Sequence, residues 1–150
     1  MTGREAARQV FKYGIYVVFA ATVLQFLLAG LGIFGRSDYF FWHAAVNPFL
    51  VGLLPLVLVL VGWYAGVDVR TRWLAAGMFG LVVLQSLLLA PYRGAAPEPW
   101  RDISALHALN AVFIFWVALH LLDRVRHPET AAARSGVGQE APAGPERVAP

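Results

Sequence analysis

Residues 23–30 read VLQFLLAG and residues 83–90 read VLQSLLLA, and each stretch lies inside a long apolar run. An α-helix needs about 20 apolar residues to cross the hydrocarbon core of a bilayer. Four such runs occur, over residues 11–34, 40–64, 73–90 and 103–122, and the third is the shortest. Because lipid offers no hydrogen-bonding partner to a peptide group, runs of this length predict helices that span a membrane.

The sequence therefore predicts an all-α integral membrane protein, a four-helix antiparallel bundle made of two tandem helical hairpins. Its 59% apolar residues and mean hydropathy of +0.61 exceed the values of a soluble domain, which is about half apolar. The first run is longer than the apolar core of a secretory signal, so we expect it to be retained. We predict a membrane domain over residues 1–126 and a disordered cytoplasmic tail over residues 127–150, which offers little to bury.

Basic residues flank the four runs unevenly, and this asymmetry predicts the orientation of the chain. One side of the predicted membrane path holds Arg4, Arg8, Lys12, Arg70, Arg72, Arg124 and Arg126, and the other holds Arg36, Arg93 and Arg101. Both termini are therefore predicted to be cytoplasmic, in the inner membrane of a bacterial cell. The net charge of +3 is spread over flanks that meet anionic headgroups, so we expect the lipid bilayer as a partner and no nucleic acid.

The polar residues of the apolar runs recur in the same order in both halves of the sequence. The order is Gln, outer loop, His and Asn: Gln25, His43 and Asn47 in the first half, and Gln85, His107 and Asn110 in the second. This recurrence predicts a parallel repeat with a pseudo-twofold axis along the membrane normal. Spacings of four and three residues put each His and the Asn that follows it on one helix face. Since unsatisfied polar groups are costly in lipid, we expect these six side chains to form one polar layer in the outer half of the bundle.

Four segments together resemble a known family of small four-helix bacterial membrane proteins that is classed as a domain of unknown function. They are QFLLAGLGIF at the end of the first run, the histidine that opens the second, LQSLLLA in the third and LHALNAVFIF at the start of the fourth. The resemblance covers roughly residues 20–125. It implies the fold and the polar layer, but no activity.

Two classes of function follow from the polar layer. In the favoured interpretation the protein is a structural or accessory bundle, and its six polar side chains hydrogen-bond across helices to fix the packing. The alternative is a redox membrane protein that binds b-type haem, with His43 and His107 as axial ligands of the iron and the Gln and Asn side chains orienting the imidazoles. A quinone pocket that uses the same donors is a variant of this alternative.

Other functions find less support in the sequence. Coupled transport usually needs an ionisable group at membrane depth, and the four runs hold no carboxylate. The absence of cysteine removes disulfides and thiolate metal sites, and two histidines are too few to close a structural zinc site. No spacing of serine with a base and an acid suggests hydrolysis, so we do not expect an enzyme. His120 lies on another helix face than His107, and His127 falls in the tail.

Small residues near the polar layer favour close helix packing, with a cavity walled by small side chains as the less favoured interpretation. The many glycines also offer contacts for a homo-oligomer or for another membrane protein. The sequence specifies neither a subunit number nor a partner.

Overall fold

The computed structural model of the protein describes residues 1–94 and 97–128, and within these ranges the chain is helical and forms no strand. Four helical segments are long and apolar enough to cross a membrane: Gly3–Phe34, Tyr39–Ala65, Val69–Arg93 and Trp100–Arg126. They include the four predicted runs. The predicted disordered tail lies outside the described residues, except for its first two.

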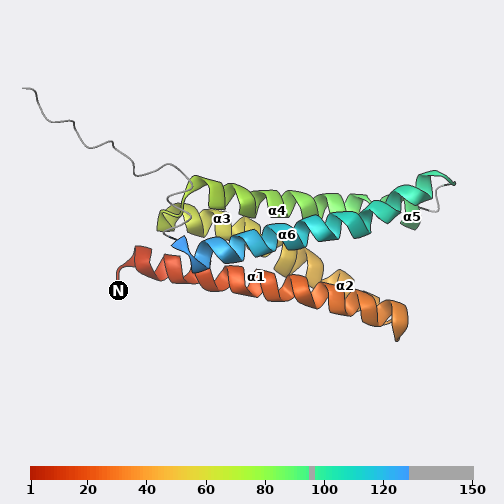
Figure 1. The fold of residues 1–150 in the computed structure, drawn as a ribbon, viewed down its shortest axis with the longest axis horizontal. Coiled ribbons are helices and arrows are strands. Elements are labelled where there is room, and N and C mark those ends of the chain that lie inside the picture. Colours follow the sequence, from red (N-terminus) through yellow and green to blue (C-terminus); the bar gives the residue numbers. More distant parts are fainter. Residues whose placement is uncertain (95–96, 129–150) are drawn as a thin grey trace, which may run out of the picture.

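The segments divide into regular α-helices and shorter irregular pieces (Figure 1). The first is the single helix α1 (Gly3–Phe34), and the second consists of α2 (Tyr39–Val46), the π-helical η1 (Asn47–Leu53) and α3 (Leu54–Ala65). The third consists of α4 (Val69–Leu87) and α5 (Ala90–Arg93), and the fourth of the 3-10 helix η2 (Trp100–Ala105) and α6 (Leu106–Arg126).

Two helices begin before the apolar run that predicts them, because polar residues cap their first turns. Thr2 and Glu5 form a capping box in which each side chain bonds the other's backbone N–H, and α1 starts at Gly3. The Asp68 side chain accepts a hydrogen bond from the backbone N–H of Thr71, and α4 starts at Val69. Such caps place the helix starts outside the hydrocarbon-length segments.

The second segment changes its helical geometry between two prolines. Pro48 lies in the first turn of η1, and Pro55 follows its end. The backbone N–H of Leu54 donates to the carbonyl of Phe49, five residues earlier, as in a π-helix. Proline cannot donate a backbone hydrogen bond and crowds the carbonyl four residues before it, so a wider turn ahead of Pro55 relieves that conflict. The irregularity that these prolines introduce therefore takes the form of a π-helical segment.

The four segments pack in a ring in which α1 contacts α3 and α6, and α4 also contacts α3 and α6. The main apolar core lies inside this ring and includes Phe11, Ile15, Val18, Leu58, Met78, Ala118 and Leu121. Gly62 of α3 lets the Phe11 ring approach closely, since a Cβ built there would lie 2.9 Å from the ring. Close packing through small residues is thus present in this part of the bundle.

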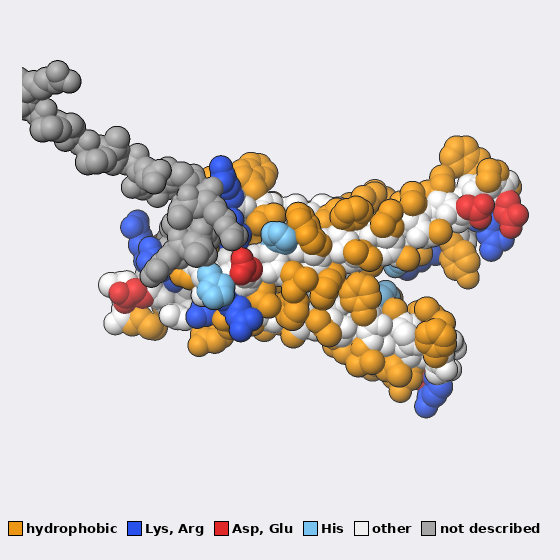
Figure 2. All heavy atoms as spheres, in the orientation of Figure 1, with side chains coloured by type: hydrophobic (Ala, Val, Ile, Leu, Met, Phe, Trp, Pro, Cys, Tyr) orange, Lys and Arg blue, Asp and Glu red, His pale blue; other side chains and the backbone are white. Residues whose placement is uncertain are grey.

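The outer surface of the spans is apolar, and the charges gather at the ends. Figure 2 shows hydrophobic side chains along the length of the molecule, with basic and acidic side chains at its two ends. Large side chains exposed on the spans include Leu27, Phe49, Leu60, Leu87 and Trp116. Exposure of so many apolar side chains to water would be unfavourable, whereas contact of these side chains with lipid tails is not. This distribution fits a protein whose surroundings are a lipid bilayer.

The two ends of the molecule differ in shape. At one end, the N-terminal end, the start of α1 lies near the α3–α4 turn and the end of α6 (Figure 1). At the other, the far end, the tip of α1 with α2 stands apart from α5 and η2, and Figure 2 shows a cleft between these two prongs. The base of this cleft holds the polar layer.

Candidate functional site

A cavity of about 620 Å³ opens at the far end and is named here the histidine cavity. It is lined by five of the six residues of the predicted polar layer: Gln25, His43, Asn47, Gln85 and His107. The sixth, Asn110, is buried beside Gln85. The structure therefore brings together around one space the polar side chains that the sequence singles out.

The two histidines are held by the same kind of contact. His43 Nδ1 lies 3.1 Å from the backbone carbonyl oxygen of Gln25, and His107 Nδ1 lies 3.0 Å from that of Gln85. A carbonyl oxygen only accepts, so in each contact Nδ1 carries the proton and donates. This fixes the tautomer of each neutral imidazole and leaves Nε2 with a free lone pair, which can accept a hydrogen bond or bind a metal ion.

The imidazole rings of the two histidines face one space. Their centres lie 6.4 Å apart, and their planes are inclined at 54°. At this distance the rings are not stacked on each other, and both are only partly buried. A small group or a metal ion between them would be within reach of both rings.

One of the two glutamines is fully engaged with its neighbours. Asn110 Nδ2 donates to Gln85 Oε1 at 2.6 Å and also lies 2.9 Å from the backbone oxygen of Leu81. Gln85 and Asn110 are each 5% exposed. This contact joins α4 to α6 at the floor of the cavity, as expected for polar side chains that fix helix packing.

The other glutamine has no such partner. Gln25 is 7% exposed, and among the described residues neither its Oε1 nor its Nε2 has a hydrogen-bonding partner. The corresponding asparagine, Asn47, makes no side-chain hydrogen bond recorded in the described chain. A buried, unpaired amide costs about 1–3 kcal/mol for each unsatisfied group, so this amide is available to a ligand that would satisfy it.

The remaining walls of the cavity are mostly small or apolar. Small side chains from three helical segments line it: Ala29, Ala44, Ala108 and Ala111. The interpretation of these residues as cavity walls, less favoured from the sequence, therefore describes this end of the molecule. Thr22 also lines the cavity, and its hydroxyl donates to the carbonyl of Val18 at 2.8 Å.

Sequence reasoning missed two lining residues, Tyr92 and Arg93 of α5. They lie just after the third apolar run, and the sequence predicts only that Arg93 flanks the membrane. Their place beside Pro91, which favours the start of a further helical turn, is the signal that could have found them.

His120 lies away from the cavity, as its angular position on the helix predicts. Its Nδ1 is 3.0 Å from the carbonyl of Trp116, and its ring centre is 4.0 Å from that of the Trp116 ring. Within residues 1–94 and 97–128, no group of three or more His, Cys, Asp or Glu side chains is placed to hold a metal ion. Within these residues, a metal ion at His43 and His107 would have no third His, Cys, Asp or Glu ligand.

The comparisons with known proteins find a likeness to one family over part of the chain, and no activity. Residues 25–91 match the model of a family of unknown function, DUF6220. The match begins at Gln25, includes the first histidine and ends just after Gln85, so the resemblance noted in the sequence is confirmed over this range. No curated protein and no solved structure matches the chain.

Proposed function

We propose that the protein is a multi-pass membrane protein whose histidine cavity binds b-type haem between His43 and His107. The single observation that carries the proposal is the pair of imidazoles, with centres 6.4 Å apart and each oriented by the same backbone contact. Haem with two axial imidazoles needs two neutral histidines that present nitrogen lone pairs from opposite sides.

The ring separation agrees with the size of such a site. An imidazole nitrogen lies about 2 Å from a bound transition metal. If both Nε2 atoms bound one metal ion, two such bonds and the distance from each nitrogen to the centre of its ring would give a separation close to the 6.4 Å between these rings. The Nδ1 contacts would supply the second-shell hydrogen bonds that usually orient metal-bound imidazoles.

The rest of the cavity suits a flat, mostly apolar ligand with a polar edge. Its volume of about 620 Å³ falls within the range of cofactor pockets, roughly 300–1,000 Å³. The alanine-rich walls leave space beside the histidines, and Gln25 offers an unused donor and acceptor. Arg93 lines the same cavity, and its guanidinium is suited to the carboxylates that haem carries at one edge.

The proposal also includes the arrangement of the helices and their orientation in the membrane. We propose two antiparallel hairpins related by a parallel repeat, a membrane domain over residues 1–126, both termini in the cytoplasm and a place in the bacterial inner membrane. The matching contacts of His43 with Gln25 and of His107 with Gln85 support the repeat, and the basic flanks support the orientation.

A spectroscopic experiment tests the proposal. Protein purified in mild detergent from cells supplied with haem is expected to be red, with a reduced-minus-oxidised spectrum of low-spin, six-coordinate haem. His43→Ala and His107→Ala should each abolish that spectrum, because each leaves one axial position open. His107→Met should instead retain haem with an altered spectrum, because a thioether can replace an imidazole as axial ligand.

The matched control is His120→Ala, which removes a histidine outside the cavity and should leave the spectrum unchanged. Far-UV circular dichroism of each variant reports whether the helices have formed. Colourless wild-type protein under haem-replete expression would overturn the haem proposal. The function of the polar layer would then be to fix helix packing, as the contact between Asn110 and Gln85 does between α6 and α4.

A further inference from the structure

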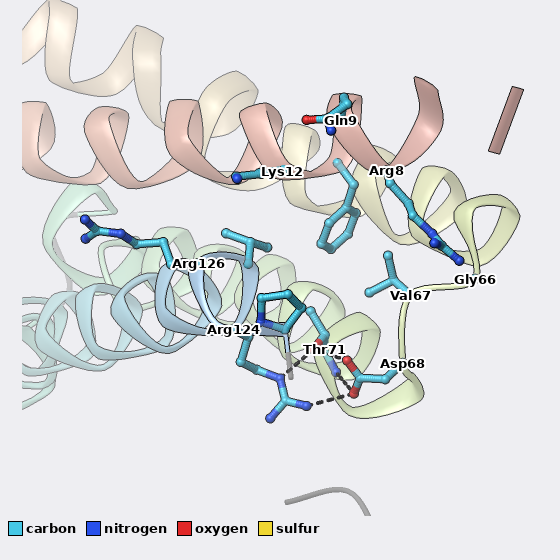
Figure 3. A pocket seen from close by; sticks show the side chains of 12 residues that line it. Arg8, Gln9, Lys12, Gly66, Val67, Asp68, Thr71, Arg124 and Arg126 are labelled. Atoms are coloured by element: carbon cyan, nitrogen blue, oxygen red, sulfur yellow. Dashed lines mark hydrogen bonds and ion pairs between the residues drawn. The ribbon is translucent and has the colours of Figure 1, made fainter. Parts of the chain in front are cut away.

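A second cavity, of about 540 Å³, lies at the N-terminal end, between α1, the α3–α4 turn and the end of α6. Figure 3 shows its lining from close by. It is named here the basic cavity because four basic residues line it, Arg8, Lys12, Arg124 and Arg126, against one acidic residue, Asp68. It lies at the opposite end of the molecule from the histidine cavity and shares no lining residue with it.

The one acidic residue is already paired within the protein. Asp68 accepts hydrogen bonds from the backbone N–H of Thr71 at 3.1 Å, from the hydroxyl of Thr71 at 2.5 Å and from Arg124 Nη2 at 2.8 Å. Partial burial raises the pKa of this carboxyl, but the bonds from Thr71 and the charge of Arg124 outweigh burial and hold the pKa below its usual value. Asp68 is therefore ionised at neutral pH and offsets the charge of Arg124.

Each of the other three basic residues has side-chain N–H groups that can donate hydrogen bonds to a ligand. Arg8 donates through Nε to the carbonyl of Ala65 at 2.9 Å, a bond that does not use its two terminal nitrogens. Neither Lys12 nor Arg126 has a side-chain partner in the described part of the chain. In Figure 3 the side chains of Lys12 and Arg126 extend to the side away from Asp68, whereas Arg8 extends toward Gly66. Three positive charges around one space repel one another, and a bound anion would relieve that repulsion.

The chemistry of the lining indicates the kind of anion. Guanidinium groups bind phosphate oxygens with two parallel hydrogen bonds, and lysine binds them as a point charge. Apolar side chains, Phe11, Val67 and Val125, line the same space and would contact the carbon atoms next to a phosphate. Lys12 stands at the start of an apolar membrane segment, which is the depth at which lipid headgroups lie.

We infer that the basic cavity binds a phosphate-bearing anion, held by Lys12 and Arg126. Basic pockets between membrane helices are known to hold phosphorylated lipid headgroups, and free phosphate offers the same oxygens. The inference does not depend on haem, because the two cavities lie at opposite ends.

Native mass spectrometry in detergent, with phosphatidylglycerol or phosphatidylcholine added, tests the lipid as the source. Phosphatidylglycerol is expected to remain bound through desolvation while phosphatidylcholine, whose choline offsets the phosphate charge, is lost. Lys12→Gln and Arg126→Gln should each weaken retention by about tenfold, the usual effect of one charge-assisted hydrogen bond. Arg4→Gln is the matched control: it removes the same charge from the same helix, is exposed and does not line the cavity, and should leave retention unchanged.

Inorganic phosphate tests the other source. If the site takes free phosphate, phosphate alone should raise the melting temperature of the detergent-solubilised protein, and Lys12→Gln should remove that rise. If a lipid is the ligand, phosphate should have no effect while phosphatidylglycerol raises the melting temperature. The inference is overturned if neither anion binds, or if Arg4→Gln weakens binding as much as Lys12→Gln does. Circular dichroism confirms that each variant folds, so lost binding is not mistaken for lost structure.

Discussion

Asn47 and Asn110 stand at corresponding places in the two halves of the sequence, yet only Asn110 is paired with a glutamine. The reason lies in their spacing from the preceding histidine, which is four residues for Asn47 and three for Asn110. One residue turns a helix by about 100°, so the two amides point in different directions from their histidines. Asn110 reaches Gln85, whereas Gln25 keeps both of its amide atoms unpaired.

Asn110→Leu is expected to destabilise the protein, because Gln85 Oε1 and the Leu81 carbonyl each lose the hydrogen bond that Asn110 donates. Polar contacts between membrane helices are worth on average about 0.6 kcal/mol and at most roughly 2, and the loss should fall in this range. The free energy of unfolding, from titration with a denaturing detergent followed by circular dichroism, measures it.

Asn47→Leu is the control for this prediction. It makes the same change in the same polar layer but removes no side-chain hydrogen bond within the described residues, so the free energy of unfolding should change less than in Asn110→Leu. Equal losses in both variants would mean that the contact between Asn110 and Gln85 contributes no specific stability.

The participants of the candidate site could be predicted from the sequence, but their contacts could not. Polar residues are rare in the apolar runs, so the sequence alone identifies His43 and His107 as candidate site residues. The sequence predicts that the glutamine side chains meet the histidines, whereas the structure uses the glutamine backbone carbonyls. Such contacts depend on the relative rotation and depth of two helices, which no residue type encodes.

Among the elements, α1 and α3 approach each other closely at Gly62. A Cβ at this position would lie 2.9 Å from the Phe11 ring, and Phe11 is itself 2% exposed, so the ring has little room to move. Gly62→Ala is therefore expected to destabilise the protein by about 1–3 kcal/mol, the usual cost of overpacking a core. Unfolding in denaturing detergent measures the change.

Gly77→Ala in α4 provides the matched control, because a Cβ at Gly77 would meet nothing within 4 Å. The same substitution in open space should be neutral, or should stabilise the helix by up to about 1 kcal/mol through helix propensity. Destabilisation by Gly77→Ala to the same extent would instead point to a contact at that face, such as a second copy of the chain.

Element boundaries show the limit of prediction by hydropathy. The apolar runs locate the four spans, but α1 and α4 begin earlier because Thr2 and Asp68 cap them in the polar flank. The π-helical segment from Asn47 to Leu53 was not predicted, although Pro48 and Pro55 signalled an irregularity. A proline in the sequence shows that the regular pattern of backbone hydrogen bonds in a helix is interrupted. The packing of neighbouring helices determines which irregular helical form replaces it.

At the scale of the whole molecule, the orientation in the membrane can be tested because the chain contains no cysteine. Ser37→Cys and Val69→Cys place single thiols in or beside the connections at opposite ends of the bundle. Ser37→Cys should react with a membrane-impermeant maleimide in intact cells, because basic flanks predict this connection outside. Val69→Cys should react only after permeabilisation.

Thr2→Cys reports on the N-terminus and should behave like Val69→Cys, since both belong to the end with the basic flanks. Labelling of Thr2→Cys but not of Ser37→Cys in intact cells would reverse the orientation. Labelling of all three would contradict the proposed topology.

The unpaired amide of Gln25 makes the two walls of the histidine cavity unequal. A flat guest between equal walls could enter in either of two poses related by a half-turn, and both would be populated. Here one wall offers an unused amide, while on the other Asn110 already occupies the Gln85 oxygen. One additional hydrogen bond of about 1 kcal/mol shifts such a balance roughly fivefold. A flat ligand held between His43 and His107 would therefore have one preferred orientation, and Gln25 would determine which one.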